Sequence, residues 1–174
     1  NHTLHLHKSA QASRAENSQS LSAQGYDLYV QAFPDSKNIV EMRFFYGELL
    51  YDIKRYKEAS VQYLWVADNG AKTKYQELAI VNMLLALEKE LPSDDEISKR
   101  IGKSLTPIEF TDAEKNFEAG ATRYVNTFPR GEKVVDVKFK LGRLHYAFNH
   151  LDEALGYFWE VVKKYPKSPN TLYA

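Results

Sequence analysis

The sequence contains an internal duplication, which constrains its fold more than any other feature. At an offset of 95 residues, positions 25–66 fall on positions 120–161 without a gap, and 13 of these 42 positions are identical. The shared residues are glycines, small residues and aromatic residues at helical spacing. Because a structural repeat buries its apolar face against its neighbours, the duplication indicates a repeat architecture.

Each copy of the duplication is predicted to form three helices. In the second copy, an apolar stripe with steps of three and four residues has the period of an α-helix: Ala113, Phe117, Ala121, Tyr124 and Phe128. Proline and glycine mark the helix ends. The predicted helices span 18–33, 38–53 and 56–69 in the first copy, and 111–128, 133–148 and 151–165 in the second. No stretch shows the apolar–polar alternation of a strand, so the protein is predicted to be all-α.

Between the copies, a further helix is predicted at 74–90, followed by an insertion at 91–110 that breaks the helical pattern. Ser93 and Glu96 have the spacing of a capping box, which predicts a short helix at about 94–101. The acidic run Asp94-Asp95-Glu96 suits a helix N-terminus, and no calcium-loop spacing follows it. We therefore interpret the run as a helix cap, and we expect the insertion to form a lid or a second contact surface.

Residues of both copies resemble the signature of the tetratricopeptide repeat (TPR), a pair of antiparallel helices. The matching residues are Tyr46, Gly47, Leu50, Tyr51, Tyr56, Glu58, Ala59, Tyr63 and Val66 in the first copy, and Leu141, Gly142, His145, Tyr146, Glu153, Ala154, Phe158, Val161 and Pro166 in the second. The small residues let the paired helices approach closely, and the large ones fill the groove toward the next pair. The resemblance implies a right-handed α-solenoid of antiparallel helix pairs, with about three to four repeats.

The implied repeats form a single TPR-like domain over residues 1–174. They are a degenerate leading pair at 3–33, a repeat at 38–69, a split repeat at 74–128 that contains the insertion 91–110, a repeat at 133–166 and the start of a further helix at 170–174. We therefore expect the chain to be a fragment of a longer array.

A narrower resemblance concerns residues 29–36 and 44–48, which are similar to repeats of bacterial cell-envelope scaffolds. These scaffolds include outer-membrane assembly lipoproteins, cell-division coordinators and gliding-motility proteins. The resemblance implies a non-enzymatic protein–protein interaction scaffold in the periplasm or at the outer membrane, with the cytoplasm as the alternative. Its partner would be a peptide or a helix of another protein. A structural spacer, or an array that associates with itself through its open ends, is the alternative function.

In TPR arrays the first helix of each pair lines a concave groove. The resemblance therefore implies a partner-binding face composed of Glu41, Phe44, Glu48, Tyr51, Asp52, Asn82, Asp136, Phe139, Arg143 and Tyr146. Rigid aromatic side chains supply contact area, and the charges beside them, which differ between the copies, set specificity. The alternative is that the repeated aromatic residues only pack between neighbouring first helices.

Composition argues against several other classes of function. The 23 basic and 23 acidic residues give no net charge, which removes the electrostatic attraction for nucleic acids and anionic membranes. No segment has about 20 consecutive apolar residues, so we expect no insertion into a membrane. The sequence has no cysteine and no nucleophile, phosphate-binding, zinc-protease or dinucleotide motif. It therefore predicts no enzyme activity and no catalytic, cofactor or metal site.

Two groups of histidines require interpretation. His2, His5 and His7 have the close spacing of metal ligands, although a frayed terminus is the simpler interpretation. His145 falls at a packing position between helices, and His150 falls in the turn that follows. We expect packing or solvation for both, with a pH-responsive role as the alternative.

Most aromatic residues follow the apolar stripes, so we predict that most of the following lie in the core: Tyr29, Phe33, Tyr46, Tyr56, Tyr63, Tyr124, Phe128, Phe158 and Tyr165. Trp65 and Trp159 do not correspond to each other at the offset of 95, and each is predicted to be partly exposed.

Overall fold

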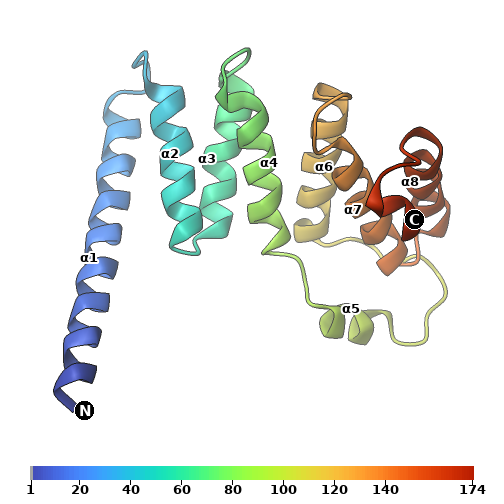
Figure 1. Cartoon of the computed structure of the whole chain (residues 1–174), viewed down its shortest axis with the longest axis horizontal. Helices are drawn as coiled ribbons and strands as arrows, with labels where there is room; N and C mark the ends of the chain where they lie inside the picture. Colours follow the sequence, from blue (N-terminus) through green and yellow to red (C-terminus); the bar gives the residue numbers. More distant parts are fainter. Residues whose placement is uncertain (1) are drawn as a thin grey trace. The chain divides into compact units, whose positions relative to one another are not determined.

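The computed structural model describes the backbone of residues 2–174 and the side chains of residues 17–174. Its elements are α1 (His2–Ala32), α2 (Ile39–Asp52), α3 (Tyr56–Asn69), α4 (Tyr75–Glu88), α5 (Asp94–Ile101), α6 (Asp112–Thr127), α7 (Val134–Ala147), α8 (Leu151–Lys164) and the 3₁₀ helix η1 (Pro169–Leu172) (Figure 1). No strand occurs in the described part of the chain, which confirms the prediction of an all-α fold. No described helix combines the length and the apolar character needed to cross a bilayer.

The chain divides into two compact units, Asn1–Ala79 and Ile80–Ala174, and the division falls within α4. Each unit contains one copy of the duplication, whereas the repeat resemblance implies one continuous domain over 1–174. The copies are thus packed as separate bodies, each with its own buried apolar residues.

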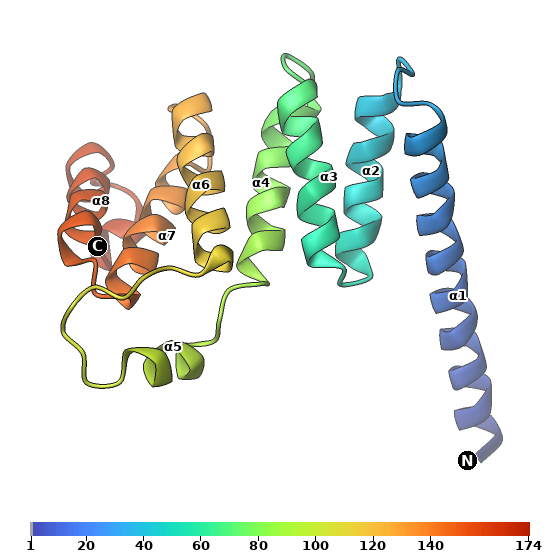
Figure 2. The ribbon, with the colours of Figure 1, turned by 180° about the vertical axis from the view of Figure 1, so that it is seen from behind.

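In the first unit, α1, α2 and α3 lie side by side (Figure 2). α2 and α3 approach closely because Gly47 faces Tyr63, and a Cβ at Gly47 would come within 2.8 Å of that ring. α1 packs on α2 through Tyr26 and Tyr46, whose stacked rings have centroids 5.7 Å apart. Leu50 of α2 is fully buried.

The helix α1 differs from the sequence prediction. Residues 3–33 are expected to form a degenerate pair of helices, but the structure has one helix, His2–Ala32. No glycine or proline occurs before Gly25, so no helix-breaking residue divides this segment. Among the described side chains of α1, only Ala23 and Val30 are buried, and α1 therefore contributes little to the apolar core.

The second unit repeats the arrangement of the first with α6, α7 and α8. Gly142 faces Phe158, and a Cβ at Gly142 would come within 2.6 Å of the ring. These residues correspond to Gly47 and Tyr63 at the offset of 95, so the same close contact joins the last two helices of each copy. Fully buried residues at the centre of this unit are Tyr124, Leu141, Phe148 and Val161.

The turn between the last two helices also has the same conformation in both copies. Lys54 and Asn149, which correspond at the offset of 95, have φ angles of 64° and 63°. This left-handed conformation is uncommon for a residue such as Lys. Its recurrence at corresponding positions shows that the duplication in sequence is also a duplication in the backbone conformation of this turn.

Within the second unit, the C-terminal half of α4 packs on α6 at Gly120. A Cβ at Gly120 would come within 2.9 Å of the Met83 side chain and 3.1 Å of the Leu84 side chain. The two helices assigned to the split repeat at 74–128 are therefore in contact through these residues.

Arg100 of α5 ties the insertion at 91–110 to the second unit. Its guanidinium pairs with Glu114 of α6 at 2.9 Å, donates to the backbone carbonyl of Glu109 and lies 4.7 Å from the centre of the Phe148 ring. Glu114 is fully buried, and it also forms a capping box with Thr111. Arg100 therefore joins α5 both to α6 and to the turn that follows α7.

The chain after α5 is held against the turn between α7 and α8. The backbone N–H of Ile108 donates to the carbonyl of Phe148 at 2.9 Å, and the Asn149 amide donates to the carbonyl of Ser104 at 3.0 Å. Ring atom Nε2 of His150 lies 2.8 Å from the carbonyl oxygen of Ile108. These hydrogen bonds hold the segment after α5 against the second unit, and several side chains of α5 remain exposed.

Two smaller elements bear on the predictions. The acidic run is a helix cap, as predicted, because Ser93 and Glu96 form a capping box at the start of α5.

In place of the helix expected at 170–174, the chain forms the short 3₁₀ helix η1 (Pro169–Leu172). Asn170 of η1 donates to Asp136 of α7 at 2.7 Å, which holds the segment against the second unit.

The prediction for the aromatic residues is only partly correct. Tyr46, Tyr63 and Tyr124 are buried, but Phe33 is 57% exposed, and the other five of the nine are half-buried. Phe33 follows the last residue of α1, and its ring packs on that of Tyr29 in α1. Trp65 is half-buried and Trp159 is exposed, as predicted.

Candidate functional site

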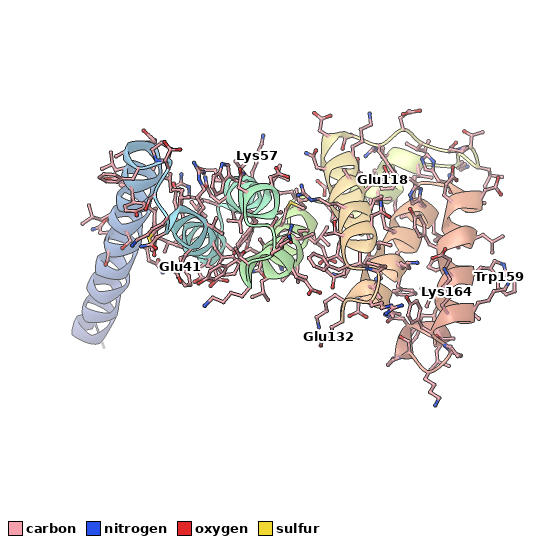
Figure 3. All side chains as sticks on the ribbon, turned by 90° about the horizontal axis from the view of Figure 1, so that it is seen from above. Glu41, Lys57, Glu118, Glu132, Trp159 and Lys164 are labelled. Carbon is pink, nitrogen blue, oxygen red and sulfur yellow. The ribbon has the colours of Figure 1, made fainter. Side chains whose placement is uncertain are left out.

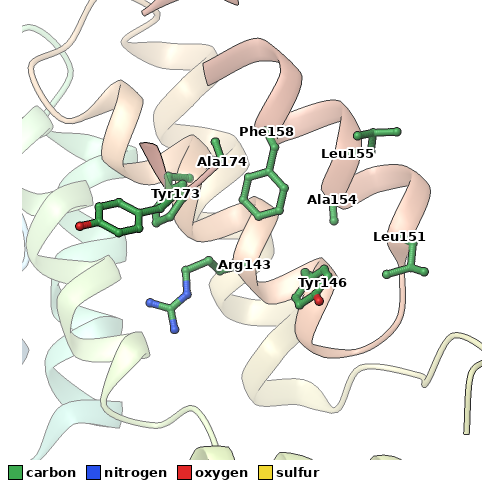
Figure 4. Close-up of a pocket in the computed structure, with 9 residues that line it drawn as sticks. Arg143, Tyr146, Leu151, Ala154, Leu155, Phe158, Tyr173 and Ala174 are labelled. Atoms are coloured by element: carbon green, nitrogen blue, oxygen red, sulfur yellow. The ribbon is translucent and has the colours of Figure 1, made fainter. Parts of the chain in front are cut away.

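An apolar pocket lies in the second unit, between α7, α8 and the end of the chain (Figure 4). Its volume is about 830 Å³, which lies in the range of ligand-binding cavities. The lining residues are Phe139, Arg143, Tyr146, Leu151, Ala154, Leu155, Phe158, Tyr173 and Ala174. Arg143 is the one charged side chain in this otherwise aliphatic and aromatic lining.

A second cavity, of about 510 Å³, adjoins the pocket through Phe139 and Arg143, which line both. It lies between α7, the C-terminal half of α4, Phe117 of α6 and Asn170 of η1. We call the two cavities together the α7 groove. Because both are lined by residues of the second unit alone, the α7 groove belongs entirely to that unit.

The charges around the α7 groove leave one cation unpaired. Lys140 pairs with Glu88 at 2.6 Å, and Asp136 accepts a hydrogen bond from Asn170. Among the described residues, none forms an ion pair or hydrogen bond with the exposed Arg143 guanidinium. Figure 4 shows this group extending away from the apolar wall of the pocket. The groove therefore combines an apolar surface with a single available positive charge.

The structure brings together the predicted site residues of the second copy. Asp136, Phe139 and Arg143 line one cavity of the α7 groove, and Tyr146 joins Phe139 and Arg143 in the other. Their spacing of three and four residues places all four on one side of α7. The Tyr146 side chain is 64% exposed, so its ring is open to a partner.

Phe44 of the first copy is buried rather than exposed on a groove. Phe44 is only 5% exposed, and its ring packs against Tyr63 and Tyr75 at centroid distances of 5.9 and 4.9 Å. It therefore packs between helices, which is the alternative that the sequence left open. Glu41 is also engaged, because it accepts a hydrogen bond from the hydroxyl group of Tyr75.

The remaining predicted residues do not line the α7 groove. Glu48 and Asp52 are exposed on α2, and Asn82 is half-buried on α4. Tyr51 is half-buried and packs edge-on against Tyr56, with ring centroids 5.1 Å apart. Of the predicted face, the residues of the second copy are thus the ones that line the α7 groove.

The contribution of α8 to the α7 groove was not predicted from the sequence. Leu151 and Leu155 line the pocket, and together with Trp159 they form a stripe in which each side chain is 53–54% exposed. Figure 3 shows Trp159 projecting outward from α8. The four-residue spacing of these side chains was a signal in the sequence, but it is also the spacing of a buried helix face.

His145 is buried in the second unit, which confirms the packing prediction. Its ring stacks on Tyr157 at a centroid distance of 5.5 Å, and its Nε2 lies 3.0 Å from the Glu118 carboxylate. Burial lowers the pKa of His145, although the Glu118 charge partly opposes this shift. The terminal group His2, His5 and His7 lies outside the residues whose side chains are described.

No model of a protein family matches this chain, and no curated protein matches it. The TPR resemblance therefore rests on the residues of the two copies, and the function has to be argued from the chemistry of the α7 groove.

Proposed function

We propose that this protein is a non-enzymatic interaction scaffold that binds a peptide or a partner helix in the α7 groove. The observation that carries the proposal is the unpaired Arg143 guanidinium beside an apolar, aromatic pocket. A partner with apolar side chains and one acidic residue would suit this surface. Burial of the apolar side chains would supply affinity, and the arginine–carboxylate pair would fix the register.

The TPR-type solenoid is part of the same proposal. The close contacts of Gly47 with Tyr63 and of Gly142 with Phe158 support it, because the repeat signature needs a small residue opposite a large one at this position. In such an array α7 is a first helix, and the side of α7 that carries Asp136, Phe139, Arg143 and Tyr146 would line the concave groove. A place in the bacterial periplasm or at the outer membrane, with the cytoplasm as the alternative, is supported by the cell-envelope resemblance alone.

The proposal can be tested with a displayed library of random peptides selected against the full chain. We expect the selected peptides to share an acidic residue spaced among apolar residues. Arg143→Glu and Tyr146→Ala should each weaken binding of these peptides by about tenfold or more, as expected for central contact residues. Lys115→Glu, an equal charge change at an exposed site of α6 outside the α7 groove, is the control.

Two results would contradict the proposal. One is a set of selected peptides without a shared acidic residue. The other is equal binding by Arg143→Glu and Lys115→Glu, with circular dichroism showing that both variants are folded.

A second candidate function is self-association, which the exposed stripe of Leu151, Leu155 and Trp159 favours. Isolated exposed apolar residues are common, but a continuous stripe on one helix is typical of an interface. If the stripe joins copies of this chain, the sedimentation coefficient should rise with concentration, and Leu155→Glu should abolish the rise. A concentration-independent monomer would exclude this function and leave the α7 groove as the binding surface.

A further inference from the structure

A cluster of potential metal ligands lies at the turn between α7 and α8. One ring nitrogen of His145, one of His150 and a carboxylate oxygen of Glu153 all lie within 4.8 Å of one another. His145 belongs to the last turn of α7, His150 is the N-cap of α8, and Glu153 lies in the first turn of α8. The short turn between the helices is what brings the three residues together.

The hydrogen bonds around the cluster orient both imidazole rings. Nε2 of His145 lies 3.0 Å from the Glu118 carboxylate, and Nε2 of His150 lies 2.8 Å from the carbonyl oxygen of Ile108. Histidines that bind metals nearly always donate their second ring N–H to a carboxylate or a backbone carbonyl in this way. Each ring is therefore held by its Nε2 atom, which leaves its Nδ1 atom as the potential ligand.

The Nδ1 atom of His145 provides the second observation. The His145 side chain is only 6% exposed, and its Nδ1 has no hydrogen-bond partner among the described residues. Buried polar atoms without a partner are rare in native structures and call for an explanation, such as an ion that they bind.

We propose that His145, His150 and Glu153 form a binding site for a divalent transition-metal ion, and that zinc fits the ligand set best. Two imidazoles and a carboxylate are ligands that zinc accepts in tetrahedral sites, with water in the fourth position. Zinc lies about 2.0–2.2 Å from such ligands, so the ligand atoms must move closer together when the ion binds. Glu153 is exposed and able to make this movement.

A metal at this position would reinforce the attachment of the insertion. His150 already contacts Ile108 of the insertion, and Phe110 packs against the rings of both histidines, at centroid distances of 5.3 Å and 4.8 Å. An ion bound by both imidazole rings would therefore hold in place the surface against which Ile108 and Phe110 of the insertion pack.

The test uses the full chain with His2→Gln, His5→Gln and His7→Gln, so that the terminal histidines cannot bind the probe. Zn²⁺ is titrated by calorimetry into the metal-stripped protein, and Co²⁺ is titrated with detection of its visible absorption. Glu153→Gln and His150→Asn are compared with Asp152→Asn, which removes a neighbouring exposed charge outside the cluster. Asparagine at position 150 preserves a favourable helix N-cap.

We expect one Zn²⁺ per chain, and an intense Co²⁺ spectrum of tetrahedral type that Zn²⁺ abolishes. Glu153→Gln and His150→Asn should each weaken binding by about tenfold or more, whereas Asp152→Asn should not. The proposal is overturned if the chain with the three terminal replacements binds no Zn²⁺ at millimolar concentration. It is also overturned if Zn²⁺ binding is unchanged in both Glu153→Gln and His150→Asn.

Discussion

Gly47 lets the ring of Tyr63 lie directly against the backbone of α2, because no side-chain atom separates them. Tyr63 is 2% exposed and is surrounded by the core, so its ring has little room to move away. The same contact in the second unit involves Gly142 and Phe158. At these two positions, the absence of a single carbon atom determines how closely two helices pack.

Gly47→Ala should therefore destabilise the protein, although alanine is the better helix former. Accommodating the added carbon would cost about 1–3 kcal/mol in the free energy of unfolding, as for other overpacked cores. Gly156→Ala is the matched control, because a Cβ at this helical position meets no atom within 4 Å. That substitution should stabilise the protein by about 0.5–1 kcal/mol. Urea unfolding measures both values, and equal effects of the two substitutions would contradict the account.

Glu114 makes the stability of the protein depend on pH. Burial raises the pKa of Glu114, but hydrogen bonds from Thr111 and the pairing with Arg100 outweigh burial, and the net pKa is below its ordinary value of 4.5. A carboxylate with a lowered pKa contributes stability above about pH 4.5, and this contribution is lost as the pH falls further. The pairing should therefore be weakened by acid.

Glu114→Gln should be less stable than the native sequence by about 1–3 kcal/mol at pH 7, because its amide replaces a charged acceptor. The difference should shrink as the pH falls from 5 to 3, because protonation removes the same charge from the native side chain. Thermal unfolding across this pH range measures the effect, with the exposed Glu90→Gln as the control. If the difference in stability between Glu114→Gln and the native sequence stays constant from pH 7 to pH 3, the charge of Glu114 does not contribute to the stability of the protein.

Phe44 illustrates what residue patterns cannot distinguish. A residue that faces a binding groove and one that faces a neighbouring helix have the same spacing along α2. Phe44 is buried because Tyr75, from a segment outside the duplication, packs on its ring. For the same reason the sequence could predict that Asp136, Phe139, Arg143 and Tyr146 share a face, but not that this face borders open cavities.

At the scale of helices, α2 to α8 were predictable because each has an apolar stripe or a clear end signal. Phe33-Pro34, Asn69-Gly70 and Phe128-Pro129 stop helices at the positions where the structure ends them, to within a residue. That residues 2–32 form one long helix was not predicted. The repeat pattern suggested a pair of helices here, although the residues contain no signal for a break between them. The docking of the insertion was also missed, since a contact between Arg100 and Glu114 leaves no periodic signal.

Arg100→Gln should loosen the insertion without unfolding the unit. The substitution removes the ion pair with Glu114 and the contact with the Phe148 ring. Chymotryptic cleavage after Leu105, which is 89% exposed, should then become several times faster, because cleavage requires the segment to detach locally. Lys99→Gln, at the exposed position next to Arg100, should leave the rate unchanged. Equal rates in the two variants would mean that Arg100 does not hold the insertion.

At the scale of the whole molecule, the duplication gives two compact units that share the close contact between their last two helices and differ in their surfaces. The second unit carries the α7 groove, the insertion and the exposed stripe of α8. In the first unit, Phe44 and Glu41 of the predicted binding face are engaged by Tyr75. Repetition therefore preserved the helix packing, whereas the features proposed for binding lie in one copy.

The central claim is that an acidic residue of a partner pairs with Arg143 in the α7 groove. A charge exchange tests it most directly, with a selected peptide and a second version of it in which the acidic residue is replaced by lysine. We predict that Arg143→Glu binds the native peptide at least about tenfold more weakly, and that the lysine peptide restores its affinity. If the lysine peptide binds the native protein and Arg143→Glu equally well, the two charges do not meet and the claim is wrong.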